Sequence, residues 1–478
     1  MSSTNHEPSI DMTLVGLGQA GDRIIDCFAS YFTPDGKPVY NTLALNSNDG
    51  DLAELKNVPM ENRFSLKLGG LGKNPEKAMS ILEDNESAKE LLKEFVTKRI
   101  RVKDKMVVFV AGLGGGTGTA TLVKAIEEFH EYHNMKYVKE ELKKIIQQIG
   151  PAEYKANSNK YKTLAFREAE NKFIKIGVIA CLPVRSDGPD VLRQVNNFAN
   201  RIWTAAKNPT KGISFVWFPD NQMFYDRFKE ERGKLSNIEN YRDFANIEIA
   251  DIIHQLNIGT NAGGTSVVYD SHDFRRTISE HNGCLVLNKL EVPSKTISSS
   301  TDLNKLLVKS IQENRFHDPI QLIETNESGE SLYSKVYHVG MLAIIPPELN
   351  SFGSSFIDDA KDEISQQLRI QGTIFSGYLI RKNNYNVTAY TIYKTDALPS
   401  RLSRGLVEEY TEFMEKQKET QFKESGAIQQ IAATNEDYLD FELDEMDLGI
   451  ELDDITNDDE LGDINIDDEL LNIDPNKM

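Results

Sequence analysis

Cysteines and long apolar runs are scarce in this sequence of 478 residues, and both absences narrow the class of protein. The three cysteines, Cys27, Cys181 and Cys284, are far apart in the chain. That spacing offers neither a disulfide framework nor the paired ligands of a zinc motif. No apolar run approaches the roughly 20 residues that cross a bilayer, and the first residues lack the basic and apolar blocks of a signal peptide. We therefore expect a soluble, cytoplasmic protein without membrane contact and without metal ligands among its side chains.

The net charge of −20 is distributed very unevenly. From Glu436 to Met478 the chain has 18 acidic residues and one basic residue, Lys477, a net charge of −17 that leaves −3 for the other 435 residues. The apolar residues of this segment are too few to bury much surface, which predicts a disordered acidic tail over 435–478. Such a tail repels phosphate, so we expect no direct nucleic-acid binding. It could dock a basic partner or act as an electrostatic brush.

Short apolar runs alternate with amphipathic stretches through the first half of the chain. The candidate strands are Met12–Val15, Tyr40–Leu45, Met106–Ala111, Lys175–Leu182 and Ile213–Phe218. Strands that alternate with helices predict an α/β fold with a doubly wound parallel sheet. Ligands of such sheets bind at the carboxyl ends of the strands. A Lys/Glu-rich segment at 131–172 reads as a partly helical surface insertion.

The domain organisation follows from changes in this pattern. We predict a nucleotide-binding domain over 10–236, a long central helix over 237–257 and a loop with a helix over 258–282. Apolar periodicity then changes, which favours a second, smaller α+β domain over 283–397. A C-terminal helix over 398–434 precedes the acidic tail.

A first glycine cluster, Gly16-Leu-Gly-Gln-Ala-Gly21, follows a strand and opens a helix. The backbone N–H groups of such a turn, together with the helix dipole, bind phosphate. A dinucleotide-binding turn is the alternative, but it needs an acidic residue at the end of the second strand. That strand ends in Asn46-Ser-Asn48, which weakens the alternative of an oxidoreductase.

A second glycine cluster, Gly112-Leu-Gly-Gly-Gly-Thr-Gly-Thr119, also links a strand to a helix. So many glycines allow the backbone to approach a highly charged group closely, because no Cβ obstructs it. Two phosphate-binding turns on two strands indicate a ligand with a polyphosphate tail.

These residues resemble a known family. Gly114-Gly-Gly-Thr-Gly-Thr119 resembles the signature of the tubulin/FtsZ superfamily, and Gly18-Gln-Ala-Gly21 is similar to the opening turn of tubulins and of the CetZ group. The resemblance implies a tubulin-like fold that binds GTP with Mg²⁺. The GTP-binding residues that it implies are Gly16, Gly18, Gln19, Ala20, Gly21, Asp22, Asn46, Asn48, Gly70, Gly72, Lys73, Asn74, Gly114, Gly115, Gly116, Thr117, Gly118, Thr119, Asp187, Asn221, Tyr241 and Asn246.

The roles that the resemblance implies differ along the chain. The segment Gly69–Pro75 resembles the loop over the γ-phosphate, and Asp187 matches the ribose segment. Asn221 and Asn246 would bind guanine, since an amide offers both a donor and an acceptor. Tyr241 would stack on the base, although it stands five residues before Asn246, where relatives place the ring four before.

Two acids three residues apart, Asp270 and Asp273, are the candidate catalytic residues. On a helical turn they would face the same way. The resemblance implies that this loop reaches the GTP of the next subunit in a filament and positions the attacking water. A capping role for Asp270 is the alternative.

The resemblance therefore implies a GTPase that polymerises with itself. The long last helix and tail are reminiscent of TubZ and PhuZ, which segregate plasmid or phage DNA, and the tail would then contact an adaptor protein. The alternatives are a CetZ-like or FtsZ-like protein of cell shape or division, and a pseudo-tubulin regulator that does not hydrolyse GTP.

Overall fold

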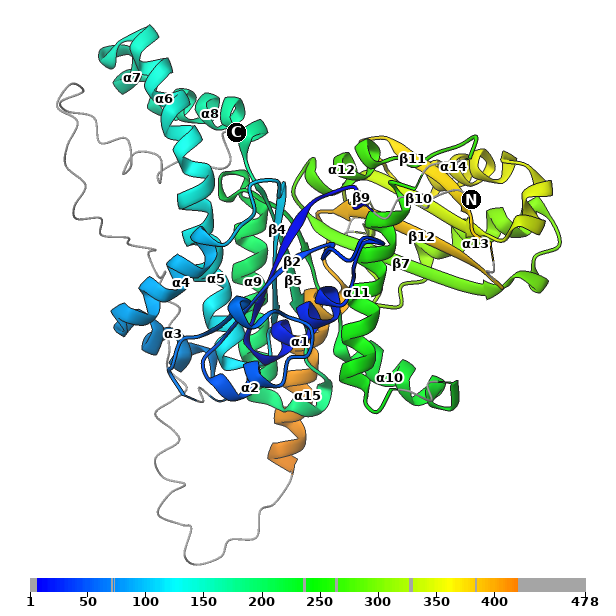
Figure 1. The fold of residues 1–478 in the computed structure, drawn as a ribbon, viewed down its shortest axis with the longest axis horizontal. Helices are drawn as coiled ribbons and strands as arrows, with labels where there is room; N and C mark the ends of the chain where they lie inside the picture. The colour runs from blue at the N-terminus through cyan, green and yellow to red at the C-terminus, as the bar shows by residue number, and fades with distance from the viewer. Residues whose placement is uncertain are drawn as a thin grey trace, which may run out of the picture.

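Ten strands form one mixed, mostly parallel sheet in this protein, in the order β11-β10-β12-β7-β6-β5-β4-β1-β2-β3 (Figure 1). The computed structural model describes residues 7–69, 72, 74–234, 238–262, 265–325, 330–382 and 385–419. The predicted α/β fold class is confirmed. The predicted acidic tail, 435–478, lies outside the described residues. None of the described helices is both long and apolar enough to cross a membrane.

The strands fall into two groups. The parallel strands of the first half are β1 (Met12–Leu17), β2 (Asn41–Asn46), β3 (Arg63–Ser65), β4 (Met106–Gly112), β5 (Lys175–Cys181) and β6 (Ile213–Trp217). The second half contributes β7 (Cys284–Pro293), β10 (Val336–Ile345), β11 (Ile374–Ile380) and β12 (Asn386–Thr395), and a separate hairpin of β8 (Ile323–Thr325) and β9 (Ser331–Tyr333). A single register pair, Val216 with Cys284, joins β6 to β7. The predicted boundary between the two domains therefore falls within one continuous sheet.

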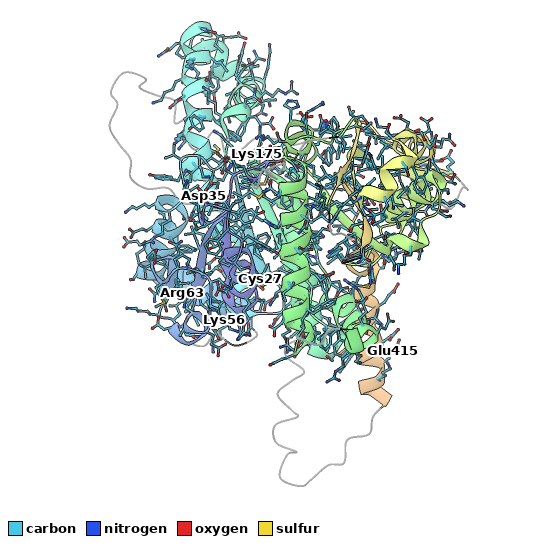
Figure 2. The ribbon with its side chains drawn as sticks, turned by 45° about the vertical axis from the view of Figure 1, so that its right-hand side comes forward. Cys27, Asp35, Lys56, Arg63, Lys175 and Glu415 are labelled. Atoms are coloured by element: carbon cyan, nitrogen blue, oxygen red, sulfur yellow. The ribbon has the colours of Figure 1, made fainter. Side chains whose placement is uncertain are left out.

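Helices cover the faces of the sheet. Those of the first half are α1 (Gly18–Ala29), α2 (Asp49–Ala53), α3 (Pro75–Asp84), α4 (Glu86–Lys98), α5 (Gly116–His130), α9 (Pro189–Lys207) and α10 (Asn221–Glu231). The others are α11 (Tyr241–Gly259), α12 (Ser271–Ser279), α13 (Ser300–Gln312), α14 (Ser355–Gln367) and α15 (Leu406–Glu419). Figure 2 shows α11 upright between the two halves of the molecule.

Two helix boundaries differ from the predicted ones. The central helix was expected from residue 237, but α11 begins at Tyr241 because the Asn240 side chain accepts hydrogen bonds from the backbone N–H groups of Arg242 and Asp243. Such a cap satisfies the free donors of the first turn and fixes the start of the helix. The last helix opens with a π-helical turn, η9 (Arg401–Gly405), before α15. Residues 420–434 of the predicted helix lie outside the described residues.

The central strands are buried on both sides, as a parallel sheet between helices requires. Along β4, Met106, Val108 and Val110 face one hydrophobic cluster, which includes residues of α1 and α11. The alternate residues Val107 and Phe109 face a second cluster, which includes residues of α4, α5 and α9. The period of two in side-chain direction thus builds two cores from one strand.

The segment 131–172 is more ordered in structure than its charge predicts. After the π-helical turn η2 (Glu131–Met135) come α6 (Lys136–Ile149), α7 (Pro151–Ala156) and α8 (Ser158–Ala169), which project from the body in Figure 1. Leu142, Tyr154 and Phe166 belong to a hydrophobic cluster of their own. At the base, Asn134 bonds both backbone groups of Ile174, at 2.9 and 3.0 Å. The insertion is therefore a small helical unit with its own core.

Two buried histidines predict that the protein loses stability in mild acid. His317 accepts a hydrogen bond from Asn314 on Nε2 and donates from Nδ1 to the Asp318 carbonyl, at 2.9 and 2.7 Å. His130 donates from Nε2 to the Thr210 carbonyl at 2.8 Å. Burial lowers the pKa of each ring from 6.5 to about 4. Between these pH values the unfolded chain binds more protons than the folded one, so stability falls as pH drops from about 6.5 to 4, on the order of 3 kcal/mol for each ring.

Thermal melts between pH 7.5 and 4.5 measure this effect. We expect His317→Gln, which keeps one donor and one acceptor, to melt with a smaller pH slope than the wild type. The difference between the two slopes cancels the contributions of the other titrating groups, which both proteins share. One of these groups is Asp22, whose pKa is raised by burial, so that it favours the folded state as pH falls. An unchanged pH slope in the variant would show that His317 does not contribute to the loss of stability in acid.

Candidate active site

The two glycine turns meet at the carboxyl ends of neighbouring strands. Strand β1 pairs in parallel with β4, Leu17 beside Ala111, so the turns that follow them emerge together. Gly18 has φ +69°, and a Cβ on it would lie 2.7 Å from the amide nitrogen of Gly118. A Cβ on Gly118 would in turn lie 2.5 Å from the Leu17 carbonyl oxygen. Glycine is thus required at both positions for the backbones to touch.

The two helices that begin at these turns suit an anion. Helix α1 starts at Gly18 and α5 starts at Gly116. The first turns of both helices lie within the described residues, and neither helix has a side-chain cap or an acidic residue there. First-turn N–H groups without side-chain partners and two helix dipoles therefore point to one place, as a site for phosphates needs.

The segments that were expected around the phosphates gather at the second turn. Thr117 Oγ1 donates to Ser47 Oγ at 3.0 Å, which joins the turn to the end of β2. The Gly116 N–H donates to the Gly72 carbonyl at 3.1 Å, so the loop that was expected over the γ-phosphate lies beside the turn. Asn74 caps α3 by accepting from the Lys77 N–H at 2.9 Å. Gly70 and Lys73 lie outside the described residues.

Three predicted contact residues have their side chains in the interior. Asp22 is 1% exposed and accepts from the Leu45 N–H at 3.1 Å and from Asn46 Nδ2 at 2.9 Å. Burial raises the pKa of this carboxyl well above its ordinary value. Thr119 is fully buried and donates to the Gly115 carbonyl at 2.7 Å. Asp22, Asn46 and Thr119 therefore help to shape the two turns, because their polar atoms bond to the end of β2 and to the second glycine turn. Their direct contact with a nucleotide stays a prediction.

The other predicted residues of the first turn are either packed against the sheet or exposed to solvent. Gly16 and Gly21 pack α1 against the sheet, since a Cβ on Gly21 would lie 2.0 Å from the Val110 carbonyl oxygen. Gln19 and Ala20 are exposed at the rim. Gln19 donates to Asp51, whose backbone N–H is bonded by Asn48. Ser47 and Asp51 were missed by the sequence reasoning, although Ser47 lies inside the Asn46-Ser-Asn48 motif.

The loop that carries Asp270 and Asp273 lies at the other end of the sheet. Arg275 on α12 donates to the Ser9 carbonyl at 2.7 Å, just before β1 begins. The glycine turns follow the last residue of the same strand. A strand of six residues spans roughly 20 Å. Within one chain the two acids therefore lie too far from the turns to touch a ligand bound there.

Comparisons with known proteins find tubulin-like relatives. Over 437 residues the chain is 23% identical to the tubulin-like protein TubZ of Bacillus cereus, covering 88% of this chain and 87% of that protein. A stretch of 116 residues is 30% identical to the tubulin-like protein CetZ1 of Haloferax volcanii, 23% of this chain and 28% of CetZ1. The crystal structure of a GTPγS-form protofilament of TubZ from Bacillus thuringiensis serovar israelensis matches with a TM-score of 0.61 at 21% identity, covering 87% of this chain and 95% of that one. The chain belongs to the tubulin/FtsZ superfamily. No protein-family profile matches this tubulin-like chain.

The residues that were expected around guanosine lie on three elements of the tubulin-like chain. Asp187 ends the short helix η4 (Arg185–Asp187), and Asn221 is the first residue of α10. Asn246 is half-buried on α11. Tyr241, five positions earlier, lies on a different face of that helix and packs edge-on against Tyr225, with ring centroids 5.2 Å apart.

Arg242 shares a face of α11 with Asn246, because the two are four positions apart. Its guanidinium lies 4.8 Å from the centroid of the Tyr241 ring. A guanidinium plane can stack on an aromatic ring system, so Arg242 is a further candidate for contact with the base. Sequence reasoning missed it because it looked for an aromatic residue at this position.

The residue that precedes Asp270 is packed against the second half of the sheet. Tyr269 is buried, and its hydroxyl donates to Thr277 Oγ1 at 3.0 Å. A Cβ on Gly340 would lie 2.2 Å from the Tyr269 hydroxyl, and one on Gly377 would lie 2.1 Å from its amide nitrogen. Two glycines thus make room for the residue that precedes Asp270.

Asp270 and Asp273 lie together at the start of α12, as expected. Asp270 accepts from the N–H groups of His272 and Asp273 through Oδ1, at 2.8 and 2.9 Å. It is exposed, and it caps the helix in this structure. Burial and the neighbouring Asp270 raise the pKa of Asp273. Possible ligand atoms of Asp270, His272 and Asp273 all lie within 4.8 Å of one another.

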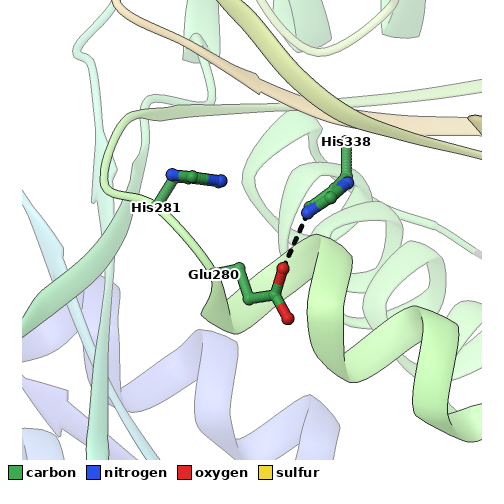
Figure 3. Close-up of side chains that lie close together, drawn as sticks. All are labelled: Glu280, His281 and His338. Carbon is green, nitrogen blue, oxygen red and sulfur yellow. Dashed lines mark hydrogen bonds and ion pairs between the residues drawn. The ribbon is translucent and has the colours of Figure 1, made fainter. Parts of the chain in front are cut away.

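Hydrogen-bonded side chains hold the carboxyl end of α12, where Glu280 and His338 meet (Figure 3). The Thr373 N–H donates to His338 Nδ1 at 2.9 Å, so the ring proton is on Nε2, which donates to Glu280 at 2.8 Å. Glu280 also pairs with Arg276 at 3.0 Å. Glu280, His281 and His338 lie close enough to share a metal ion, but this tautomer directs a proton, not a lone pair, at Glu280. We therefore assign Glu280 and His338 to anchoring the helix that carries the two acids.

Proposed function

We propose that this tubulin-like chain is a GTPase that polymerises into filaments with GTP and hydrolyses it at the contact between subunits. The observation that carries the proposal is the separation of the two halves of the site. The glycine turns lie at the carboxyl ends of β1 and β4, and the paired acids lie before the amino end of β1. A whole site therefore forms only when a second copy stacks end to end on the first.

The proposed ligand is GTP, with its phosphates on the two turns. The N–H groups of the first turns of α1 and α5, other than that of Gly116, supply donors for the oxygens, and Mg²⁺ supplies charge neutralisation when it is bound. The hydroxyls of Ser47 and Thr117 are hard oxygen donors of the kind that Mg²⁺ uses, so the residues present fit that ion. The relative whose protofilament holds GTPγS supports this choice of nucleotide.

In the proposed reaction the neighbour's loop positions water. The oxygen of the water bonds to the γ-phosphorus while the bond from that phosphorus to the bridging oxygen of the β-phosphate breaks, and GDP leaves. Asp270 keeps Oδ2 free of hydrogen bonds among the described residues, so it can accept one from the water. Asp273, whose pKa is raised, is the nearby group that can take the proton.

The cellular role that we propose is segregation or positioning of plasmid or phage DNA. The length over which the chain matches TubZ, most of both proteins, favours this over a CetZ-like role in cell shape or an FtsZ-like role in division. The acidic tail would recruit a basic adaptor protein in the cytoplasm, and the DNA would be held by that adaptor.

The rate of GTP hydrolysis per subunit tests the shared site. We expect the rate per subunit to rise with protein concentration, because each site needs a neighbour, and filaments to be present in electron micrographs only when GTP or a slowly hydrolysed analogue is added. A dilute monomer that hydrolyses GTP at the full rate would contradict the shared site. Binding of GTP without filaments and without hydrolysis at any concentration would favour the pseudo-tubulin regulator.

A further inference from the structure

Arg401 is a buried arginine at the point where the last helix joins the body. It begins η9, the turn that leads into α15, and it is 1% exposed. Arginine is rarely buried this completely unless all its donors find partners. Its partners lie on three segments that are far apart in the sequence.

The contacts of Arg401 tie α15 to two loops. Nη1 donates to the Pro183 carbonyl at 2.7 Å and to Asp220 Oδ1 at 2.6 Å. Nε and Nη2 donate to the carboxylate of Glu409 on α15, at 3.1 and 3.0 Å. Arg185 also donates to Glu409, at 3.1 Å. Two carboxylates and two guanidinium groups thus balance in charge, as buried charges require.

Both loops border the site that we propose for the nucleoside of GTP. Pro183 follows β5 and leads to Asp187, and Asp220 directly precedes Asn221 at the start of α10. The loops are also joined to each other, since the Asn221 N–H donates to the Leu182 carbonyl at 3.1 Å. Asp220 Oδ2 is buried and has no hydrogen-bond partner among the described residues. Arg401 is therefore the counter-charge that holds this carboxylate, and with it the loop of Asn221, in place.

We propose that Arg401 is a positioning residue for the nucleotide and that it couples the docking of α15 to the affinity for GTP. The proposal rests on the proposed function, since it assumes that GTP binds at these loops. Coupling between two sites is reciprocal. Nucleotide should therefore tighten the docking of α15, and a partner that pulls on the chain beyond Glu419 should weaken the hold on GTP.

Three variants separate positioning from general stability. Arg401→Lys keeps the charge but loses the planar fork that reaches three partners at once. Glu409→Gln weakens the link between Arg401 and α15 and leaves Asp220 paired. Arg404→Gln is the matched control, because Arg404 lies on the same turn, is exposed, and donates to Gln321 at 2.7 Å on the surface.

The first measurement is the affinity for a fluorescent GTP at protein concentrations below those that give filaments. We expect Arg401→Lys to bind about tenfold more weakly than the wild type and Glu409→Gln about fivefold more weakly, with Arg404→Gln within about twofold. The second measurement is amide hydrogen exchange of residues 406–416 with and without saturating GTP. In the wild type GTP should slow this exchange, and in Glu409→Gln the slowing should be largely lost.

The possible outcomes distinguish failure of the coupling from failure of the proposed function. If the wild type binds GTP but exchange in α15 does not change and both variants bind as tightly as the control, the coupling is wrong and the proposed function stands. If the wild type does not bind GTP, the proposed function itself fails. Should Arg401→Lys not fold, Glu409→Gln and the exchange of the wild type still decide the question.

Discussion

Asp270→Ala is expected to slow GTP hydrolysis in filaments by at least about 100-fold while leaving the affinity for GTP within about twofold of the wild type. The loss of rate follows from removing a preorganised group that acts on the attacking water, a class of change that commonly slows catalysis by that much. The affinity stays because Asp270 lies at the end of the sheet opposite to the phosphate turns. Filaments of the variant should therefore persist after assembly, as sedimentation and single-turnover assays can show.

The control for this experiment must separate catalysis from helix capping, because Asp270 accepts from two N–H groups at the start of α12. Loss of a cap costs about 1 kcal/mol and would also displace Asp273. Asp270→Asn keeps a good cap and removes the charge. We expect the Asn variant to melt like the wild type and to hydrolyse GTP as slowly as the Ala variant. Normal hydrolysis by the Asn variant would assign Asp270 to capping alone.

Gly18→Ala is expected to abolish most GTP binding, with a loss of affinity on the order of 100-fold. A Cβ at this position would lie 2.7 Å from the amide nitrogen of Gly118, so the two phosphate turns must separate to admit it. A displacement near 1 Å in a site of this kind can cost that factor. Titration with fluorescent GTP measures the loss, and a thermal melt measures the accompanying loss of stability, roughly 2–4 kcal/mol.

Gly36→Ala is the matched control for the backbone conformation. Gly36 has φ +78°, close to the +69° of Gly18, but a Cβ on it would meet no described atom within 4 Å. It therefore shares the left-handed strain, about 1–2 kcal/mol, and lacks the contact. GTP affinity should be unchanged in this variant. Equal losses of affinity in the two variants would show that strain, and not the meeting of the turns, explains the effect.

The features that the sequence could predict are those encoded within a few neighbouring residues. Each glycine turn can be recognised in the sequence because a buried strand leads directly into glycines and then into a helix. The pairing of Val216 with Cys284, which merges the two halves into one sheet, joins residues 68 positions apart and leaves no local pattern. The inward direction of Asp22 depends on the end of β2, which neither the glycine motif nor the family resemblance describes.

Helix geometry along α11 changes one functional prediction. Arg242, four positions before Asn246, shares a face with it, and Tyr241, five positions before, does not. The core of the insertion was missed for a different reason. Its apolar residues are spread over three short helices and include Tyr154 and Phe166, so no single stretch has a long apolar period.

The same insertion makes the two ends of the molecule unlike. It leaves the body after His130, at the end of α5, and returns beside Ile174, just before the amino end of β5 (Figure 1). If subunits stack as we propose, every copy carries this projection on the side that faces its neighbour's nucleotide. In electron micrographs the repeated helical unit would then mark the polarity of each filament without any label.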